Sequence, residues 1–415
     1  MTDVASLNPF TLEAIEDPYP VHRALRERGV VFVTEAGSWC ISRWDDVEAV
    51  LQDHQQFSSQ NVGGGAGGMA DETLAAIAKE AFRPVAVLTP CDPPDHSHYR
   101  RVVARSFSPQ GLTEVEPGIR AIVDRLIDRF VDKGQCDLVA EFAQPFPLHV
   151  FAEMVGIPPE DIPQMKRWTD DRIEMMGAAV GRVERPRMYE LARSNVEAQR
   201  YLWAKIEDVR EHPRDDLLTH MVHAEMPGFG GRSLDDDELM SMVQTVLDGG
   251  NETTVNLVAN GMALLLQHPD QAAIVRDDPS WTANAIEEVL RVESPVQCLF
   301  RTTKVDAAVG GVEIPAGQRL AILYGAANRD PARWERPDDL DVTRADAKRA
   351  VHFGAGVHFC LGAHLARLEG RIAFDALLAR LPNLRLVEGR NTFHHHVSPI
   401  VRGLTELWVE WDVAS

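Results

Sequence analysis

The sequence has little positive charge, few cysteines and no long apolar run. Its 415 residues include 42 lysines and arginines against 63 aspartates and glutamates, a formal net charge of −21. This balance argues against non-specific nucleic-acid binding, which needs a basic surface. The apolar runs are too short to cross a bilayer, and the first residues lack the basic start and apolar stretch of a signal peptide. We therefore expect a cytoplasmic protein with no nucleic-acid or membrane partner.

The cysteines are too few and too scattered to form a disulfide framework. There are five, at positions 40, 91, 136, 298 and 360. Reduced thiols are the default in the cytosol, so a disulfide is a weak interpretation for any of them. The chain also lacks internal repeats and long low-complexity tracts, and its 45% of apolar and 25% of charged residues are ordinary values. These absences indicate a soluble globular protein.

The order of secondary-structure signals predicts a mainly α fold with a minor β part (α+β). Residues about 30–60 mix strand and helix signals, and the pattern from about 95 to 292 is mostly helical. Short strand signals return between 296 and 325, where GGVEIPAGQRL predicts a hairpin, and the tail TELWVEWDV predicts another strand. No linker separates independent halves, so we expect residues 1–415 to form a single domain.

The longest helical signal is interrupted near its middle. It runs from Ser233, which can cap the start, to Pro269, which marks the end. Gly249 and Gly250 each cost about 1 kcal/mol relative to alanine inside a helix, and four polar residues, NETT, follow them. Two interpretations stay open. The glycines form a notch for another element, or the helix opens its backbone hydrogen bonds beside a ligand, where a hydroxyl and a carboxylate relay protons.

A lone cysteine, Cys360, follows a glycine-rich turn and precedes a predicted helix. On these residues alone it could be a zinc ligand with His358 and His364, a nucleophile, a buried structural thiol or a haem thiolate. Structural zinc needs four ligands and no second motif is evident, and nothing specific indicates the base that a nucleophile requires. In the haem interpretation, glycines such as Gly354 and Gly362 let the backbone approach a flat macrocycle, and the helix start favours the thiolate.

The stretch FGAGVHFCLG, residues 353–362, resembles the haem-binding signature of the cytochromes P-450, F-x-x-G-x-H/R-x-C-x-G, at all of its fixed positions. The resemblance implies the cytochrome P-450 fold, a triangular prism with a long central helix crossing the haem, and the soluble bacterial class of the family. It also implies haem b (iron protoporphyrin IX) as cofactor and Cys360 as the metal ligand. Phe353, Gly354 and Gly362 then belong to the cofactor-binding residues.

A second segment resembles a motif of the same family. CDPPDHSHYRRVVARSFSP is similar to D-P-P-x-H-x-x-x-R, which places His96 and Arg100 at positions that bind the haem propionates. Arg301 and His358 match two more propionate-binding positions, and such donors suit carboxylates shielded from water.

The segments EEVLR and RPDDLDVTR resemble a structural motif of the family. They supply Glu288 and Arg291, spaced to pair on one helix face, and Arg344. Leu340 stands where the family usually has phenylalanine. The resemblance gives these residues a structural role, which is to fix the loop that leads into the cysteine turn.

The stretch LDGGNETT resembles the family's acid–alcohol segment, A/G-G-x-D/E-T. Glu252 and Thr253 fall on the pair to which the family assigns catalytic proton delivery during O₂ activation. Peroxide-driven relatives commonly lack this pair, so its presence favours O₂ and two electrons as the working oxidant. Asp248 departs from the family, which often has an aliphatic residue facing the substrate there. A buried acid is costly unless it is paired, so Asp248 either points to solvent or a helix neighbour, or contacts a hydroxyl or amine of the substrate.

These features together predict a monomeric haem-thiolate monooxygenase. It would insert one oxygen atom from O₂ into a C–H bond of a small, largely apolar organic substrate, such as a terpenoid, steroid or aromatic. We expect no fused reductase or ferredoxin domain, so a separate ferredoxin and ferredoxin reductase would supply two electrons. Alternatives are a haem-binding sensor, a peroxide-driven peroxygenase, and a zinc-dependent or plain helical binding protein. The residues expected to line the substrate pocket are Thr245, Asp248, Gly249, Val296, Cys298 and Ile400.

Overall fold

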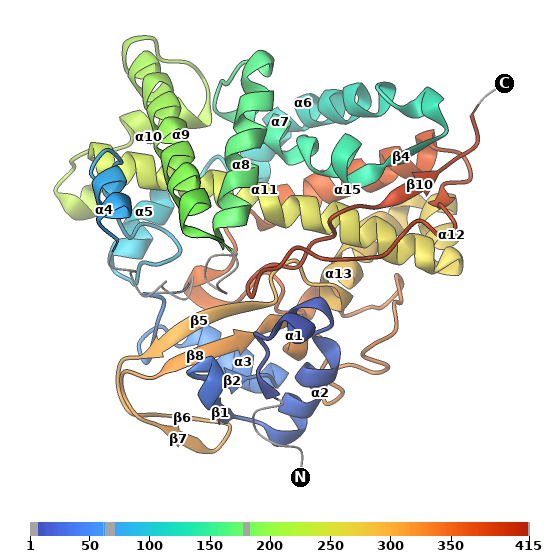
Figure 1. Ribbon diagram of the computed structural model, residues 1–415, viewed down its shortest axis with the longest axis horizontal. Helices are drawn as coiled ribbons and strands as arrows, with labels where there is room; N and C mark the ends of the chain where they lie inside the picture. The colour runs from blue at the N-terminus through green and yellow to red at the C-terminus, as the bar shows by residue number, and fades with distance from the viewer. Residues whose placement is uncertain (1–6, 61, 63–70, 177–182, 414–415) are drawn as a thin grey trace. The chain divides into compact units, whose positions relative to one another are not determined.

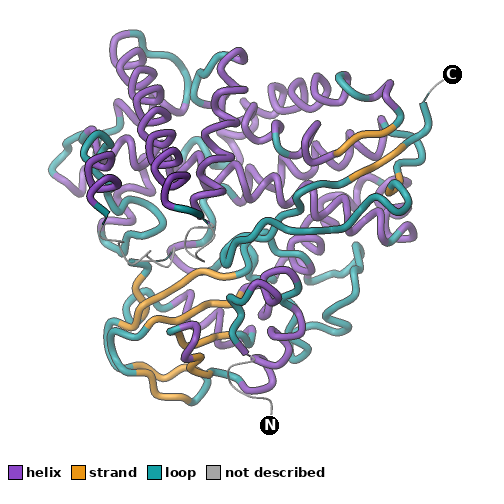
Figure 2. The backbone as a smooth tube through the Cα atoms, viewed as in Figure 1, coloured by secondary structure: helices purple, strands orange, loops and turns teal. Residues whose placement is uncertain are grey.

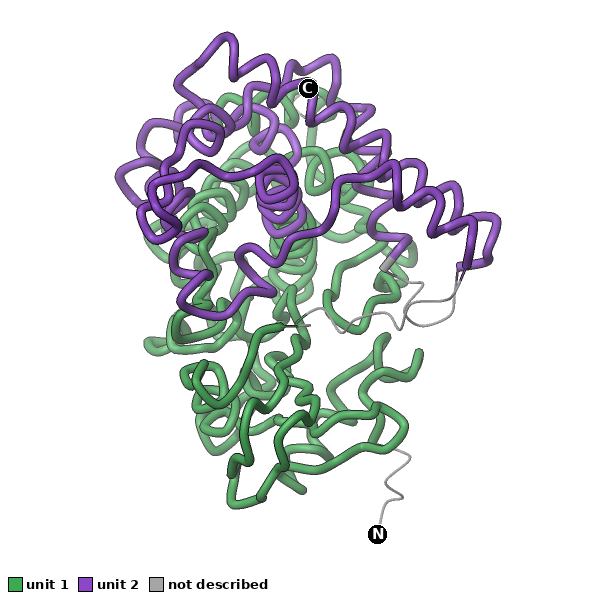
Figure 3. The backbone as a smooth tube through the Cα atoms, turned by 90° about the vertical axis from the view of Figure 1, so that its left-hand side faces the viewer, with its two compact units in different colours: residues 1–64, 119–146, 252–415 green, residues 65–118, 147–251 purple. Residues whose placement is uncertain are grey.

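The computed structural model describes residues 7–60, 62, 71–176 and 183–413. Most of these residues are helical and a smaller part forms strands, which confirms the expected α+β class (Figures 1 and 2). The chain divides into two compact units that each combine segments distant in sequence (Figure 3). Unit 1 contains residues 1–64, 119–146 and 252–415, and unit 2 contains residues 65–118 and 147–251. The single domain expected from the sequence stays a prediction.

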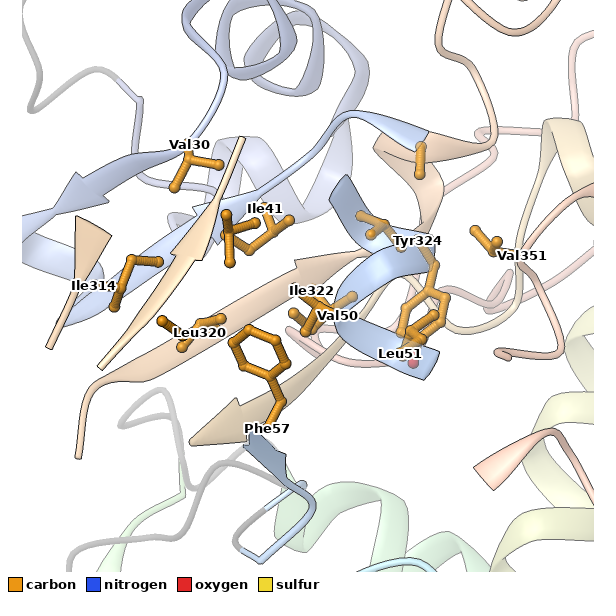
Figure 4. Close-up of a cluster of buried hydrophobic side chains, with 14 residues drawn as sticks. Val30, Ile41, Val50, Leu51, Phe57, Ile314, Leu320, Ile322, Tyr324 and Val351 are labelled. Atoms are coloured by element: carbon orange, nitrogen blue, oxygen red, sulfur yellow. The ribbon is translucent and has the colours of Figure 1, made fainter. Parts of the chain in front are cut away.

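Unit 1 contains a five-stranded sheet in the order β1-β2-β8-β5-β3. Strands β1 and β2 pair antiparallel in the part of the chain where strand signals were expected, β2 pairs in parallel with β8, and β8 pairs antiparallel with β5. One face of the sheet packs against apolar side chains of helix α3, where Ile41, Leu320 and Ile322 meet Val50 and Leu51 (Figure 4). The strands are β1 (Val31–Val33), β2 (Ser38–Ile41), β3 (Phe57–Ser58), β5 (Cys298–Thr303) and β8 (Arg319–Leu323).

The hairpin expected within GGVEIPAGQRL turns earlier than the sequence suggested. Strand β6 (Ala307–Val309) pairs with β7 (Val312–Ile314) across Gly310 and Gly311. These glycines have φ of 58° and 80°, which is the backbone that a tight hairpin turn requires. The residues after the PAG turn form β8, which pairs with β2 and β5 instead of β7. The expected pairing was therefore wrong, because β8 pairs with two strands that lie outside the GGVEIPAGQRL segment.

The strand expected in the tail is β10 (Trp408–Glu410). It lies between β4 (Gln135–Asp137) and β9 (Arg385–Leu386) in a three-stranded antiparallel sheet of unit 1. The α-helices of unit 1 are α1 (Leu12–Glu16), α2 (Tyr19–Arg28), α3 (Trp44–Gln52), α12 (Pro269–Asp277), α13 (Thr282–Val292), α14 (Tyr324–Ala327) and α15 (Ala363–Arg380). Its short helices are η2 (Thr34–Ala36), η3 (Val131–Lys133), the π-helical η4 (Val139–Ala143), η8 (Pro279–Trp281), η9 (Ala347–Arg349) and η10 (Gly356–His358).

Unit 2 is helical in its described residues, and its longest helix, α9, packs against α4, α8 and α10 (Figure 1). Its helices are α4 (Glu72–Ala78), α5 (Asp95–Ala104), η5 (Pro159–Asp161), α8 (Ile162–Met176), α9 (Arg185–Glu211), α10 (Leu217–His223) and η7 (Pro227–Phe229). Three helices have residues in both units: α6 (Pro109–Asp128), α7 (Pro145–Met154) and α11 (Asp236–Gln267). None of the helices described here has both the length and the hydropathy for a membrane span.

Helix α11 corresponds to the longest helical signal but starts later than expected. Asp235 Oδ1 accepts a hydrogen bond from Glu238 N at 2.9 Å, and Glu238 Oε2 accepts one from Asp235 N at 2.8 Å. This reciprocal pair is a capping box. The expectation that Ser233 caps the helix was therefore wrong, because the Asp235 carboxylate lies nearer to the free N–H groups of the first turn.

Candidate active site

Cys360 ends a folded turn in unit 1. Its backbone N donates to the carbonyl oxygen of Phe353 at 2.8 Å, which closes the turn. Gly354 and Gly356 have φ of 71° and 67°, in the left-handed region that glycine adopts without strain. A Cβ atom at Gly356 would lie 2.7 Å from the carbonyl oxygen of Leu51 in α3. Both glycines are therefore favoured by their backbone conformation, and Gly356 also by its close contact with α3.

The surroundings of the Cys360 thiol fit a haem. The thiol is partly exposed and forms no disulfide with another described cysteine, and α15 begins three residues later at Ala363. A helix N-terminus favours negative charge, which here would be the thiolate. A Cβ built on Gly362 would meet no described atom within 4 Å, so there is open space beside the turn. A soft thiolate ligand next to a glycine-lined space is the donor that a haem iron can use.

The zinc interpretation of Cys360 lacks its ligands. Across the described parts of the chain, no three His, Cys, Asp or Glu side chains come together as a metal-holding group. His358 lies in η10, directly before the cysteine turn ends, and His364 lies in the first turn of α15. The short sequence spacing of these residues therefore does not produce a metal centre in the fold.

A buried cluster of charged and polar groups lies behind the turn, and the sequence analysis missed it. Glu287 of α13 forms an ion pair with Arg367 of α15, and Glu287 Oε2 lies 3.2 Å from His352 Nε2. Burial raises the pKa of Glu287, but hydrogen bonds from His352 and Arg367 outweigh it and hold the pKa at about 2. The Arg367 guanidinium lies 4.5 Å from the centre of the Phe353 ring, and the His352 ring packs edge-on at 4.7 Å. The cluster thereby fixes Phe353, one of the expected haem-binding residues.

The three residues of the expected structural motif meet in the interior of unit 1. Glu288 accepts two hydrogen bonds of 2.8 Å from Arg291, and Arg344 Nε lies 2.9 Å from Glu288 Oε1. Arg291 also donates to the backbone oxygens of Asn328, at 3.0 Å, and Pro337, at 2.7 Å. This network ties α13 to the long loop that leads into the cysteine turn.

Arg301 lies on β5 of unit 1 and is buried, with 4% of its surface exposed. Its Nη1 donates to the backbone oxygen of Phe300 at 2.9 Å, and this bond uses one of the five N–H donors of a guanidinium. Arg301 is therefore rich enough in donors to bind a carboxylate. Its role toward a haem propionate stays a prediction.

Three of the expected pocket residues lie at the meeting of β5 with the C-terminal segment. Val296 forms a β-bridge with Val401, and the carbonyl oxygen of Ile400 accepts a hydrogen bond from Gln297 N at 2.7 Å. Cys298, in contrast, belongs to a hydrophobic core cluster with Leu25 and Cys40 and is only 1% exposed. It also borders a small hollow together with Gln297 and Leu323, and its contact with a substrate stays a prediction.

The middle of α11 carries the expected acid–alcohol pair. Glu252 is buried and Thr253 half-buried, both in the part of α11 that belongs to unit 1. The helix continues through Gly249 and Gly250, and both glycines are exposed. A Cβ built on either would meet no described atom within 4 Å. Neither the packed notch nor the interrupted helix expected from the sequence is present, and the glycines instead leave open space beside an unbroken helix.

Thr254 contacts a buried acid that the sequence analysis missed. Its hydroxyl donates to Glu369 Oε2 of α15 at 3.1 Å, and both side chains are buried in unit 1. Burial raises the pKa of Glu369 to about 8, and the hydrogen bond from Thr254 offsets only part of this effect. The sequence spacing could have predicted that Glu369 is buried. Glu369 follows Leu365 by four positions and precedes Ile372 by three, which places it on the apolar face of the helix.

Glu369→Gln is expected to remove part of the pH dependence of stability. The pKa of Glu369 is raised on folding, so its contribution is fully present below the unfolded value and is lost as the pH rises through about 8. Between about pH 6 and pH 9 the wild type should lose about 2 to 3 kcal/mol more unfolding free energy than the variant. Urea titrations of both proteins at the two pH values measure this difference. Parallel pH profiles would contradict a neutral Glu369 in the folded state.

Two expected propionate-binding residues lie on one helix of unit 2. His96 and Arg100 are four positions apart on α5, so they share a face of the helix. His96 is buried and Arg100 partly exposed. The helix thus presents both side chains in one direction, as joint binding of an anionic group requires. That they bind the propionates stays a prediction.

Asp248 is paired with an arginine of another helix in unit 2. Arg172 of α8 donates from Nε to Asp248 Oδ1 at 2.8 Å, and a second, short contact joins Arg172 Nη2 to Asp248 Oδ2. Of the two orientations left open by the sequence, Asp248 adopts the one toward a helix neighbour. The sequence analysis missed Arg172, because Lys166 and Arg167 of the same helix were equally plausible partners. A contact of Asp248 with substrate stays a prediction.

The two remaining pocket candidates lie beside Asp248 on α11. Thr245 is half-buried and donates its hydroxyl to the carbonyl oxygen of Ser241 at 2.7 Å. Gly249 is exposed, with open space beside it. Their contact with a substrate likewise stays a prediction.

Comparison with known proteins gives a consistent result across most of the chain. The family model described as cytochrome P450 matches residues 280–389. The vitamin D(3) 25-hydroxylase of Pseudonocardia autotrophica is 35% identical over 94% of this chain and 93% of that relative. Cytochrome P450 107B1 of Saccharopolyspora erythraea is 35% identical over 98% of both chains. The structure of cytochrome P450 CYP109Q5 from Chondromyces apiculatus matches with a TM-score of 0.84 and 34% identity over 98% of both chains.

Proposed function

The chain belongs to the cytochrome P450 family of monooxygenases, and from this premise we propose that it inserts one oxygen atom from O₂ into a C–H bond of a small, largely apolar organic molecule. The observation that carries the proposal is the Cys360 turn, which combines a partly exposed thiol outside any described disulfide, two left-handed glycines and open space at Gly362. The family uses a haem, and we propose haem b. Terpenoids, steroids and aromatic compounds are the substrate classes to test first.

Cys360 would hold the haem iron through its sulfur, and Phe353, Gly354 and Gly362 would line the adjacent face. His96, Arg100, Arg301 and His358 would bind the propionates, since two carboxylates shielded from water need positive or N–H donors. When bound, the haem supplies the activation of O₂ and the transfer of oxygen to a C–H bond. The protein holds the thiolate in place, orients the substrate and delivers protons.

Glu252 and Thr253 would deliver those protons. They are consecutive residues of α11, and Gly249 and Gly250, which have open space beside them, lie two to four positions before them. The Glu252 carboxyl would take a proton from the solvent side, and the Thr253 hydroxyl would pass it on at Oγ1. Positioned acids and alcohols of this kind contribute roughly 10²–10⁴-fold in rate.

Thr253→Ala is expected to separate electron use from product formation. NADH and O₂ consumption should continue, whereas product per NADH should fall about 10-fold or more because reduced oxygen leaves as hydrogen peroxide. Glu252→Gln should slow NADH consumption itself, since it removes the group that takes up the proton. Parallel assays of NADH, hydrogen peroxide and product measure both effects, and Thr254→Ala is the matched control because Thr254 hydrogen-bonds Glu369 instead. Unchanged coupling in Thr253→Ala would remove this residue from proton delivery.

Electrons would come from a separate ferredoxin and ferredoxin reductase. The expected monomeric state and cytoplasmic location stay predictions.

The proposal is tested by supplying a surrogate ferredoxin, its reductase and NADH to the purified protein with compounds that shift its haem spectrum. NADH-dependent oxygenated product supports the monooxygenase. Product with hydrogen peroxide alone, but none with the electron donors, would favour the peroxygenase alternative. Spectral shifts without product from either oxidant would favour the haem sensor.

A further inference from the structure

A polar cluster in unit 2 joins three helices around Arg172. The side chain of Arg172, on α8, bonds Asp248 of α11 through two N–H groups and donates a third bond, Nη1 to Asn195 Oδ1 of α9, at 2.8 Å. Gln244 of α11 donates to the same Asn195 oxygen at 3.3 Å. The cluster therefore holds the Arg172 guanidinium and the Asp248 carboxylate in one fixed orientation.

The ion pair is half-buried and has an open side. The side chains of Arg172 and Asp248 keep 28% and 30% of their surface accessible. Burial raises the pKa of Asp248, and the attraction of Arg172 offsets part of this effect. Partial accessibility of both partners is what groups in the wall of a recess show. A hollow in this unit is lined by both residues and by apolar neighbours such as Met165, Trp168 and Leu247.

The pair offers a donor and an acceptor side by side without net charge. Among the described residues, the cluster uses three of the five N–H donors of Arg172, and the Asp248 carboxylate has more lone pairs than the two Arg172 bonds occupy. A hydroxyl group can donate to Asp248 and accept from Arg172 at the same time. A carboxylate on the bound molecule would be repelled by Asp248, and an ammonium group would be repelled by Arg172. The pair therefore disfavours a ligand group of either charge.

We propose that the Arg172–Asp248 pair is a recognition site for a neutral hydroxyl group on an otherwise apolar substrate. The inference deepens the proposed function and rests on it, since it names the polar group by which the substrate is held. The apolar side chains that line the same hollow, Met165, Trp168 and Leu247, suit the apolar part of such a molecule. Leaving the donors and acceptors of a recess without a partner is costly, so the pair discriminates against molecules that lack the hydroxyl.

Three compounds that share one apolar ring test the proposal: cyclododecane, cyclododecanol and cyclododecanecarboxylate. Their dissociation constants from the haem-loaded protein are measured by equilibrium dialysis and by the shift of the haem spectrum. We expect the wild type to bind the alcohol about 10-fold tighter than the other two, the effect of one hydrogen-bonded group. Asp248→Asn leaves the charge of Arg172 uncompensated, so we expect this variant to prefer the carboxylate. A merely structural role for Asp248 would not reverse the order.

The double variant Arg172→Met with Asp248→Leu removes both charges at similar volume, and we expect it to bind alcohol and hydrocarbon equally. Arg200→Met is the matched control, since Arg200 of α9 pairs with Glu80 at the exposed surface of the same unit, and it should keep the wild-type order. Equal wild-type affinities, no detectable binding of any compound, or an unchanged order in Asp248→Asn would overturn the proposal. A normal thiolate spectrum in the same samples shows that such a failure concerns the pair, whereas its absence would mean that the proposed function itself has failed.

Discussion

Cys360→Ser is expected to abolish the red-shifted band of the reduced, carbon monoxide-treated protein and to reduce NADH-dependent oxygenation to background. Serine matches cysteine in shape, so the turn closed by the Cys360–Phe353 backbone hydrogen bond should persist. What is lost is the soft thiolate, whose electron donation favours O–O cleavage. Absorption spectra and product assays measure the two effects together.

The control for this variant is Cys136→Ala in β4, a buried cysteine of the three-stranded sheet. Burial, together with the negative charges of Glu141 and Asp137, raises the pKa of its thiol to about 12, so it stays a neutral thiol. The spectrum and activity of Cys136→Ala should match the wild type. An intact red-shifted band in Cys360→Ser would show that another residue binds the iron.

Glu288→Ala is expected to produce the largest loss of stability among the site variants. Glu288 and Arg291 have fully buried side chains, and Arg344 keeps only 8% of its side chain exposed. Removing the carboxylate leaves two guanidinium groups without their counter-ion, which costs roughly 3–5 kcal/mol. This is a large part of the 5–15 kcal/mol or so by which such proteins are stable. Urea unfolding followed by circular dichroism measures the loss, and haem content should fall with it.

Two further variants calibrate the Glu288 result. Arg344→Met keeps the Glu288–Arg291 pair and should cost less than Glu288→Ala. Arg210→Met breaks the exposed pair of Arg210 with Asp236, which should change stability by less than about 1 kcal/mol. If Glu288→Ala fails to fold, Arg344→Met still reports on the network. A Glu288→Ala effect as small as that of Arg210→Met would contradict the structural role assigned here.

Sequence reasoning succeeded where the signal is local. Helix α11 was predicted from one long helical signal that ends at a proline, and strand signals were recognised in the part of the chain that forms β1 and β2. It failed where the partner is distant. Strand β8 carried a clear strand signal, but nothing within GGVEIPAGQRL indicates that it pairs with β2 and β5. The start of α11 was misplaced for a local reason, since Ser233 is followed by three aspartates that can also cap a helix.

The candidate site divides in the same way. Cys360 and its glycines form one short motif, so the sequence alone was enough to propose a haem-binding turn here. The acidic residues Asp248 and Glu287 of the site pair with arginines of other helices, and the sequence offers several candidate partners for each. Arg172 and Arg367 could not be chosen from spacing, because an ion pair depends on the geometry of two helices and not on a motif.

The most direct test of the account follows the oxygen atoms. The protein is supplied with a surrogate ferredoxin, its reductase, NADH, a compound that shifts its haem spectrum, and dioxygen labelled in both atoms with the heavy isotope. Mass spectrometry of the product should find one labelled oxygen atom per molecule, with the second labelled atom released as water. Product oxygen that carries no label, and so derives from water, would contradict a monooxygenase.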